Sequence, residues 1–422
     1  MPHRPVAAQT AYLIASVSYL SSTKTAFRKE TPTAISKRAM TLFARDDIDG
    51  ALALLDKALL IFPHSVTLLE SRVAILSRIR AYDRALHDLR VAVDRRKAKL
   101  RKKGYGFSCE ENGLGRESRI LISGFFYSGS GAVLDFLRSY AGVRKFPFVA
   151  GESRVVKFPG GIAEMGEVVV KDGRLHPEEI AKFYLHLVGK QIVATKKGVY
   201  HKDLIVNRNN RRLLKNEPSL GYLYQALLLL EDYWALARKK ALDHDVFVAA
   251  SRVGLARMLD AAAKQNKISK LVVDQIVTAW RIDIAQYMPP SSFIIVHRDP
   301  RDQYAEVKAA LDQPGRPKWT AQQFAGIYRS WRTRVDGHIP ILEGQHGHRV
   351  LRVGFEDFVL NHAAEAKRIL AFAGIAAGSL KKQRFFPDVS AANVGKYSQL
   401  LTREEAECLE TALPEYLHRP AR

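Results

Sequence analysis

The residues best suited to chemistry lie in one glycine- and serine-rich stretch, 119–140 (RILISGFFYSGSGAVLDFLRSY). An apolar run at 120–122 is followed by three glycines and then by apolar residues over 132–137 with the spacing of a half-buried helix. A strand that turns through small residues into a helix N-terminus leaves backbone N–H groups unpaired, and the helix dipole adds positive potential there. We therefore predict a phosphate-binding loop made of Tyr127, Ser128, Gly129, Ser130, Gly131 and Ala132.

A second candidate phosphate site follows the apolar run at 293–296. The chain continues there as His297-Arg298-Asp299-Pro300-Arg301-Asp302, which predicts a buried strand that ends in a loop with two arginines. The planar guanidinium of arginine suits bidentate binding of a phosphate. One backbone cradle and one arginine clamp, each at a strand end, match a nucleotide with phosphates on both its 5′ and 3′ sides.

The motifs of the common nucleotide-binding enzymes are absent from the loop. It has no lysine where the P-loop G-x-x-x-x-G-K-[ST] needs one, and it lacks the dinucleotide fingerprint G-x-G-x-x-G. These absences argue against kinase, GTPase and dehydrogenase functions. No His, Cys, Asp or Glu cluster has metal-ligand spacing, so we expect no metal. Cys109 and Cys408 are expected to be incidental thiols in a reducing compartment.

Four blocks between Arg119 and the C-terminus resemble the family of sulfotransferases that use 3′-phosphoadenosine 5′-phosphosulfate (PAPS) as sulfuryl donor. The glycine loop is similar to the family's 5′-phosphosulfate loop, and Arg298–Asp302 is similar to its 3′-phosphate motif, R-x-P-R-D. Residues 350–374 resemble its strand ending in Tyr-Glu-Asp-Leu with the helix that follows, and 393–397 resembles its C-terminal Gly-x-Trp segment. The resemblance implies a PAPS-dependent sulfotransferase.

The resemblance also assigns roles to individual residues. It implies that the loop holds the 5′ side of PAPS and that Arg298 holds the 3′-phosphate. Arg301 would either join Arg298 or pair with Asp302, and Asn393 and Gly395 would complete the nucleotide site.

Two positions depart from the family pattern. Tyr127 stands where a basic residue usually stabilises the bridging oxygen, and Glu306 stands where a serine usually helps to hold the 3′-phosphate. A carboxylate would repel that phosphate, so we expect Glu306 to point away or to pair with a nearby base.

The general base and the missing cation are sought outside the loop. Glu152 is the first candidate for the base, and the alternative is a surface Glu–Arg ion pair. His201 is the second candidate, against a structural histidine. Arg154 and Lys157 are candidates for the cation that Tyr127 does not supply.

The expected acceptor is a carbohydrate hydroxyl, on lipopolysaccharide, a capsular sugar or another glycan. The long insertion between Lys157 and Lys270 and the glutamate candidate favour a glycan over a small phenol. Trp319, Tyr328 and Trp331 are expected in the core, with a sugar or adenine platform as the alternative. Because of Tyr127 and Glu306, a catalytically degenerate adaptor that acts through its N-terminal repeats is the alternative function.

The elements that must position these residues alternate between strands and helices from Arg119 onward. This alternation predicts an α/β fold with a mostly parallel central sheet and helices on both faces, similar to P-loop NTPases. The expected strands are 119–123, 168–170, 191–195, 270–274, 292–297 and 349–355. The expected helices are 218–241, 251–265, 303–311, 320–336 and 361–373.

An all-α block is predicted to precede this domain, at 34–103. A pattern that begins at Ile48 recurs thirty-four residues later at Tyr82, a period that resembles the tetratricopeptide repeat. An unrelated helical hairpin is the alternative, and the block is expected to serve protein contact. The remaining divisions are a poorly defined segment 1–33, a linker 104–118 and the sulfotransferase domain 119–422.

The charge balance, 66 basic against 43 acidic residues, favours anionic partners. No binding motif supports a nucleic acid, and no run of about 18 apolar residues predicts a transmembrane helix. We expect a cytoplasmic protein. The basic run 95–103 is either a solvated helix end or a contact with an anionic glycan or the inner face of the membrane.

Overall fold

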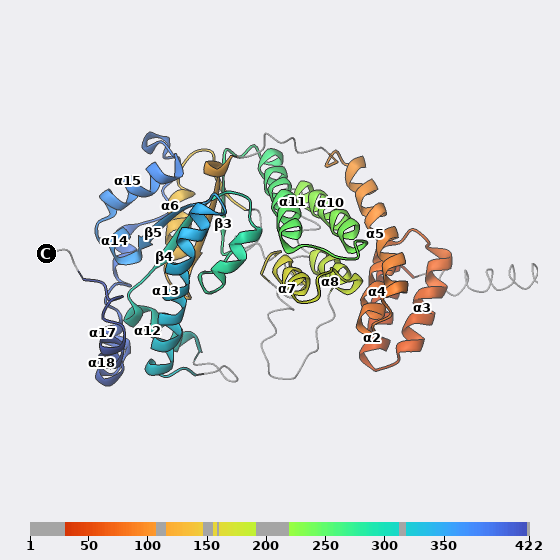
Figure 1. Cartoon of the computed structure of the whole chain (residues 1–422), viewed down its shortest axis with the longest axis horizontal. Coiled ribbons are helices and arrows are strands. Elements are labelled where there is room, and N and C mark those ends of the chain that lie inside the picture. Colours follow the sequence, from red (N-terminus) through yellow and green to blue (C-terminus); the bar gives the residue numbers. More distant parts are fainter. Residues whose placement is uncertain are drawn as a thin grey trace, which may run out of the picture.

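The computed structural model describes residues 30–106, 115–146, 155–157, 160–190, 219–311 and 318–419. The molecule is elongated, with three regions in a row along its long axis (Figure 1). The N-terminal helices lie at one end, a helical insertion lies in the middle, and the sheet with its covering helices lies at the other end.

The N-terminal region consists of four helices: α2 (Pro32–Ala44), α3 (Ile48–Ile61), α4 (Val66–Arg78) and α5 (Tyr82–Lys102). Hydroxyl or carboxylate side chains cap the first three helices at Thr31, Asp47 and Ser65. The predicted repeat starts at the first residues of α3 and α5, and the small residues that recur in it, Ala51, Ala58, Ala85 and Ala92, are fully buried. The prediction of an all-α block is confirmed.

A buried polar network fixes α5 against the insertion. The Arg96 guanidinium lies 2.5 Å from the Glu70 carboxylate, which also accepts a 2.8 Å hydrogen bond from the Tyr184 hydroxyl. Lys97 pairs with Glu231 beside them. The carboxylate of Glu70 raises the pKa of Arg96, and burial raises that of Tyr184. If one partner were removed, the other charge would stay buried without compensation, which is strongly destabilising. These ion pairs therefore favour this one arrangement of α5 against the insertion.

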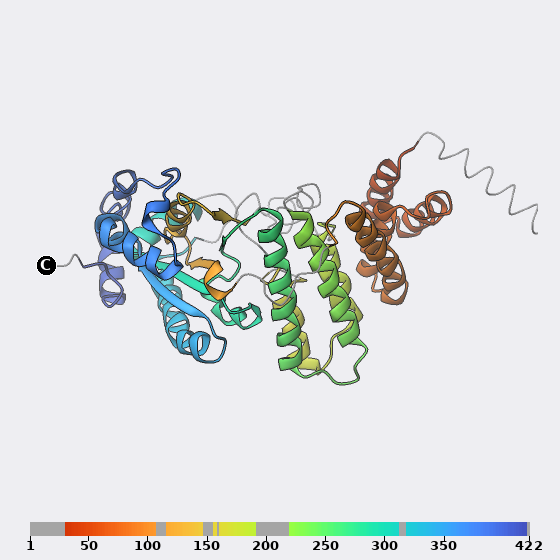
Figure 2. The ribbon, with the colours of Figure 1, turned by 90° about the horizontal axis from the view of Figure 1, so that it is seen from above.

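The insertion between the second and third strands is all-helical. It comprises α7 (Ile162–Asp172), α8 (Pro177–Leu187), α10 (Leu220–Ala237) and α11 (His244–Gln265). Figure 2 shows α10 and α11 packed side by side between the N-terminal helices and the sheet. Helix α10 is buried on most of its surface, as expected from its continuous apolar sequence. Among the described residues, no helix is long and apolar enough to cross a membrane.

The central sheet has five parallel strands in the order β2-β3-β1-β4-β5. Their bounds are β1 (Arg119–Gly124), β2 (Val143–Lys145), β3 (Lys270–Asp274), β4 (Ser292–His297) and β5 (Arg349–Gly354). The expectation of an α/β fold with a parallel sheet is therefore confirmed.

Two details of the predicted strands need comment. The strand predicted at 168–170 is wrong, because these valines lie inside α7. That helix buries Ile162, Met165 and Val169 at helical spacing, and this burial outweighs the strand preference of β-branched residues. The strand predicted at 191–195 lies outside the described residues.

Alternate residues of β1 enter separate cores on the two faces of the sheet. Ile120 and Ile122 pack with α6 (Ser130–Leu137), α14 (Phe355–Leu360) and α15 (His362–Ala373). Leu121 belongs to the larger core with the insertion and α13 (Ala321–Gly344). The remaining elements are the 3-10 turns η1 (Arg116–Ser118), η3 (Ala279–Tyr287) and η4 (Ala377–Ser379), with α12 (Pro300–Leu311), α16 (Pro387–Ala391), α17 (Tyr397–Leu400) and α18 (Arg403–Ala412).

Candidate functional site

The predicted phosphate loop lies between the end of β1 and the start of α6. Gly129 caps α6 with a φ of 87°, a conformation that glycine adopts without strain. A Cβ at this position would lie 2.2 Å from a ring carbon of Phe355. Gly131 has open space within 4 Å of its Cβ position. The loop is thus tight on its protein side and open at Gly131, as close approach of a ligand to the backbone requires.

Tyr127 is a non-glycine residue with a φ of 54°. This left-handed conformation costs roughly 1–2 kcal/mol for a residue with a side chain. The Arg298 guanidinium supports it, because Nη1 donates a 3.2 Å hydrogen bond to the Tyr127 carbonyl. The Tyr127 side chain is half exposed at the loop.

The strand order places the loop at the switch point of the sheet. From β1 the chain proceeds to β2 on one side, whereas from β4 it proceeds to β5 on the other. The two strands are neighbours, with Gly124 opposite Val296, so the segments that follow them begin side by side. Ligands of open parallel sheets bind in the crevice at such a point.

Arg298 connects three of the four blocks that carried the resemblance. Besides its bond to the Tyr127 carbonyl, its Nη2 donates a 2.5 Å hydrogen bond to the Asn393 carbonyl. Its guanidinium also lies 5.1 Å from the ring centre of Phe355, at the end of β5. Motifs far apart in the sequence therefore meet at one side chain.

The charge of Arg298 is buried and lacks a direct ion pair with any residue that the structure describes, although it attracts the nearby Asp302 and Glu356 carboxylates without touching them. The residue is 5% exposed, and among the described residues it forms no ion pair. Its Nε and the Ser128 hydroxyl are buried without a hydrogen-bond partner in the described part of the chain. Buried polar groups in proteins are normally satisfied, and an unpaired buried cation is unfavourable. An anion held by these groups would satisfy both, so the residues fit a phosphate.

Arg301 is held by carboxylates, but not by the predicted one. It pairs with Asp299 at 2.7 Å and Glu410 at 2.6 Å, and its pKa is raised, chiefly by the hydrogen bond to Asp299. The alternative in which Arg301 pairs with Asp302 is therefore not observed. Asp302 instead accepts backbone hydrogen bonds from Gly395 at 2.7 Å and Tyr397 at 2.8 Å, which fixes the C-terminal segment against α12.

Glu306 forms an ion pair with Lys396 at 3.2 Å. Of the two alternatives expected for this carboxylate, pairing with a nearby base is the one observed. The pair joins α12 to the segment that contains Gly395, next to the backbone bonds from Asp302. The Glu306 charge is thereby compensated within the protein.

Lys157 lies close to the phosphate loop. Its Nζ donates a hydrogen bond to the Gln275 carbonyl, and the Gln275 side chain donates from Nε2 to the Ser130 hydroxyl at 3.2 Å. The cation is thus linked through a single residue to the start of α6. The other candidates, Glu152, Arg154 and His201, lie outside the described residues.

The sequence did not single out Glu356. This buried carboxylate accepts a 2.9 Å hydrogen bond from the Asp299 backbone N–H, and burial raises its pKa to about 7. Burial, together with the nearby charge of Arg332, lowers the pKa of the neighbouring His297 to about 3 and keeps this residue neutral. Its position directly after the strand predicted at 349–355 is the sequence feature that could have identified Glu356 as a residue of the site.

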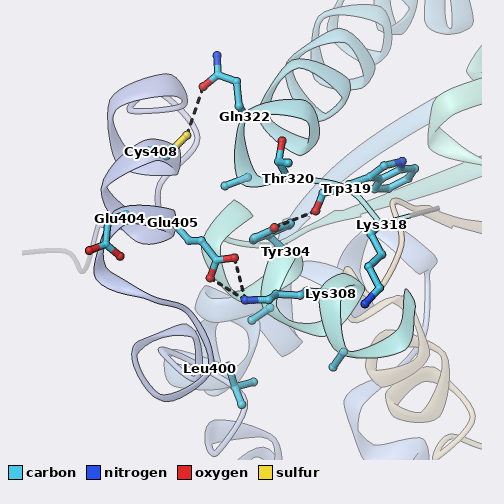
Figure 3. Close-up of a pocket in the computed structure, with 13 residues that line it drawn as sticks. Tyr304, Lys308, Lys318, Trp319, Thr320, Gln322, Leu400, Glu404, Glu405 and Cys408 are labelled. Atoms are coloured by element: carbon cyan, nitrogen blue, oxygen red, sulfur yellow. Dashed lines mark hydrogen bonds and ion pairs between the residues drawn. The ribbon is translucent and has the colours of Figure 1, made fainter. Parts of the chain in front are cut away.

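A mostly apolar hollow of about 620 Å³ lies between α12, the start of α13 and α18 (Figure 3). Trp319 is one of its lining residues, and the Trp319 ring lies 6.3 Å, ring centre to ring centre, from Phe126 in the segment after β1. Lys308 on α12 and Glu405 on α18 also line the hollow, and they form an ion pair of 2.8 Å. Tyr328 is a core residue, as expected, and its hydroxyl donates to the Arg298 carbonyl at 2.9 Å.

The chain has an α/β fold with a parallel sheet, and the glycine loop and Arg298 meet at the switch point of that sheet. Residues 205–378 match the sequence profile described as the sulfotransferase family. This part of the chain, which includes β3, β4, β5 and Arg298, is therefore similar to the sulfotransferase family. The match begins after the phosphate loop. No curated protein matches the chain.

Proposed function

We propose that this protein transfers the sulfuryl group of PAPS to a hydroxyl of a carbohydrate. The observation that supports the proposal most directly is the buried Arg298, which lies beside the phosphate loop without a direct ion pair among the described residues. The 3′-phosphate of the donor would supply the missing anion. The family match supports sulfuryl transfer as the reaction class.

The donor would lie across the carboxyl ends of β1 and β4. Backbone N–H groups of Gly129, Ser130 and Gly131, with the Ser128 and Ser130 hydroxyls, would bind its 5′ side, where the α6 dipole favours negative charge. The N–H groups of Ser128 and Ala132 already donate to the Phe125 and Gly129 carbonyls, so these two residues would shape the loop. Arg298 would bind the 3′-phosphate with its free Nε, while two carbonyls hold its Nη atoms in place. Asn393 and Gly395 would close the nucleotide site, and Arg301 would position Asp299 within the motif.

In the reaction, the acceptor oxygen attacks sulfur while the bond from sulfur to the bridging phosphate oxygen breaks. Adenosine 3′,5′-bisphosphate leaves, and the proton of the acceptor hydroxyl passes to a general base. We assign the base to Glu152, with His201 as the alternative. Such transfers depend chiefly on orientation and on stabilisation of developing charge. Lys157 would stabilise the charge on the leaving oxygen in place of the basic residue that Tyr127 replaces.

The hollow beside Trp319 supports a carbohydrate acceptor. Its volume suits a sugar ring, and Trp319 connects it to the segment after β1 through the ring contact with Phe126. A catalytically degenerate adaptor remains the second candidate function. It is favoured by Tyr127, which stands where the family has a basic residue that stabilises the bridging oxygen. The two functions differ in whether sulfate reaches an acceptor, which incubation of the protein with labelled PAPS and fractionated cell-envelope polysaccharide measures.

Adenosine 3′,5′-bisphosphate should raise the melting temperature of the protein by a few degrees. At 100 times its Kd, a ligand that binds only the folded state stabilises it by about 2.7 kcal/mol. ATP and adenosine 5′-monophosphate lack the 3′-phosphate and should give little stabilisation at equal concentration. Equal shifts with all three nucleotides in a thermal denaturation assay would contradict the role given to Arg298.

Replacement of Lys157 by Met should lower kcat about 100-fold, as loss of a group that stabilises transition-state charge does. KM for PAPS should change little, because the lysine would act mainly as charge develops on the leaving oxygen. Lys157→Arg keeps the charge and is the matched control, so it should retain more activity. If Lys157→Met turns over at the wild-type rate, another residue supplies the cation.

A further inference from the structure

An exposed apolar and basic surface lies at the end of the molecule opposite the N-terminal helices. We call it the α16 surface, and its members lie on α14, on the segment before α16 and on α16 itself. It consists of Leu360, Leu380, Lys381, Lys382, Arg384, Phe386 and Val389. Figure 1 shows α14 and α15 at this end, and α14 packs against α16.

The exposed apolar side chains of this surface come from α14, from α16, which packs against α14, and from the segment between them. Of eleven large hydrophobic side chains left exposed among the described residues, four belong to it. Leu360 is 56% exposed, Leu380 55%, Phe386 50% and Val389 73%. Clustered exposed apolar side chains on a folded protein mark a contact site more often than isolated ones do.

The exposed residues are held in place by buried neighbours. The backbone N–H groups of Lys381 and Lys382 donate to the Ser139 carbonyl at 2.8 and 3.0 Å, and that of Arg384 donates to the Ser139 hydroxyl at 3.0 Å. Phe385 is buried and stacks on Phe358 with 4.6 Å between ring centres. Phe386 is therefore presented to solvent from a fixed backbone.

The charge of the surface is positive and uncompensated. Lys381, Lys382 and Arg384 are exposed, and none of them forms an ion pair with any described residue. Asp388 is the single acidic residue between 376 and 400. Cations beside exposed apolar side chains match an anionic lipid bilayer, which offers phosphate headgroups above an apolar layer. The phosphates of a nucleic acid would pair with the cations, but a nucleic acid backbone has no apolar layer that would contact Leu380 or Val389.

We propose that the α16 surface docks the protein on an anionic membrane. The apolar side chains enter the headgroup–acyl boundary while the cations contact lipid phosphates. This membrane contact does not depend on the proposed sulfuryl transfer. If both hold, the site lies near the bilayer, because α16 leads directly to Asn393, whose carbonyl contacts Arg298.

The test is co-sedimentation of the full chain with vesicles of phosphatidylcholine alone or with 30% phosphatidylglycerol. Binding should require the anionic lipid. The triple variant Lys381→Glu/Lys382→Glu/Arg384→Glu should weaken the partition coefficient on the order of 100-fold, from the usual contribution of each surface cation. The variant Phe386→Ser/Val389→Ser should weaken it about tenfold, through lost apolar burial. Circular dichroism checks that each variant is folded.

Matched controls place the same changes elsewhere. Lys99→Glu/Lys102→Glu/Lys103→Glu has the same net charge as the first variant and alters the basic end of α5. Leu60→Ser/Val170→Ser removes equally exposed apolar side chains from α3 and α7. Both should bind like wild type. The proposal fails if only the α5 variant loses binding to the vesicles. It also fails if the serine variant at α16 binds the vesicles as tightly as wild type while heparin displaces the protein from them completely. That second result would indicate an anionic polymer as the partner.

Discussion

Replacement of Arg298 by Ala should reduce sulfuryl transfer by roughly 10³-fold, as the loss of a preorganised charge-stabilising donor does. It should also abolish the preference for adenosine 3′,5′-bisphosphate over adenosine 5′-monophosphate. Three motif segments lose their common partner, because the Tyr127 and Asn393 carbonyls are both bound by this guanidinium. Isothermal titration with the two nucleotides and a labelled-PAPS assay measure the effects.

The stability of the ligand-free Arg298→Ala protein should change by only about 1 kcal/mol. The variant loses two hydrogen bonds, but it also loses a buried charge that makes no direct ion pair with any described residue. Arg301→Ala is the matched control. It leaves Asp299 without its ion pair and should lower the melting temperature more, while it keeps the nucleotide preference. An Arg298→Ala protein that still prefers the bisphosphate would exclude this residue as the 3′-phosphate ligand.

The substitution Gly129→Val should lower the free energy of unfolding by roughly 2–4 kcal/mol, the sum of left-handed strain and steric overlap. The backbone φ is 87°, and the new Cβ would lie 2.2 Å from Phe355. Nucleotide binding should be lost as well, because the loop must move to relieve the overlap. Urea denaturation followed by circular dichroism measures the change in stability.

Gly131→Ala is the control for Gly129→Val, because its Cβ position has open space and its φ is not positive. Its unfolding free energy should stay equal or rise, since alanine is the better helix former. In Gly129→Ala, the second substitution Phe355→Leu should recover part of the loss. If Gly129→Val and Gly131→Ala have the same stability, the contact with Phe355 does not restrict the loop.

Much of the sheet could be predicted because its buried strands are continuous apolar runs. The predictions for β1, β3, β4 and β5 agree with the structure to within a residue. β2 was missed because it is three residues long, lies at the sheet edge and carries Arg144 and Lys145. The valines at 168–170 were misassigned because tertiary packing of α7 outweighed local propensity.

The parts of the candidate site were predictable, but their connections were not. Motif spacing located the glycine loop and Arg298, and strand ends suggested that they meet. Local patterns do not specify strand order, however, so the contact of Arg298 with Asn393 was not foreseen. The partners of Arg301 were not foreseen either, because Glu410 comes from α18, more than a hundred residues away. The assignments of catalytic roles stay predictions.

The strand order also determines when the protein can fold during synthesis. β1 is central, yet its two neighbours begin only at Lys270 and Ser292. A growing chain therefore carries an apolar, unpaired strand until more than half of the sequence has left the ribosome. Such edges aggregate readily, and late long-range pairing slows folding. The N-terminal helices and insertion can form first, so they would shield this strand until its partners arrive.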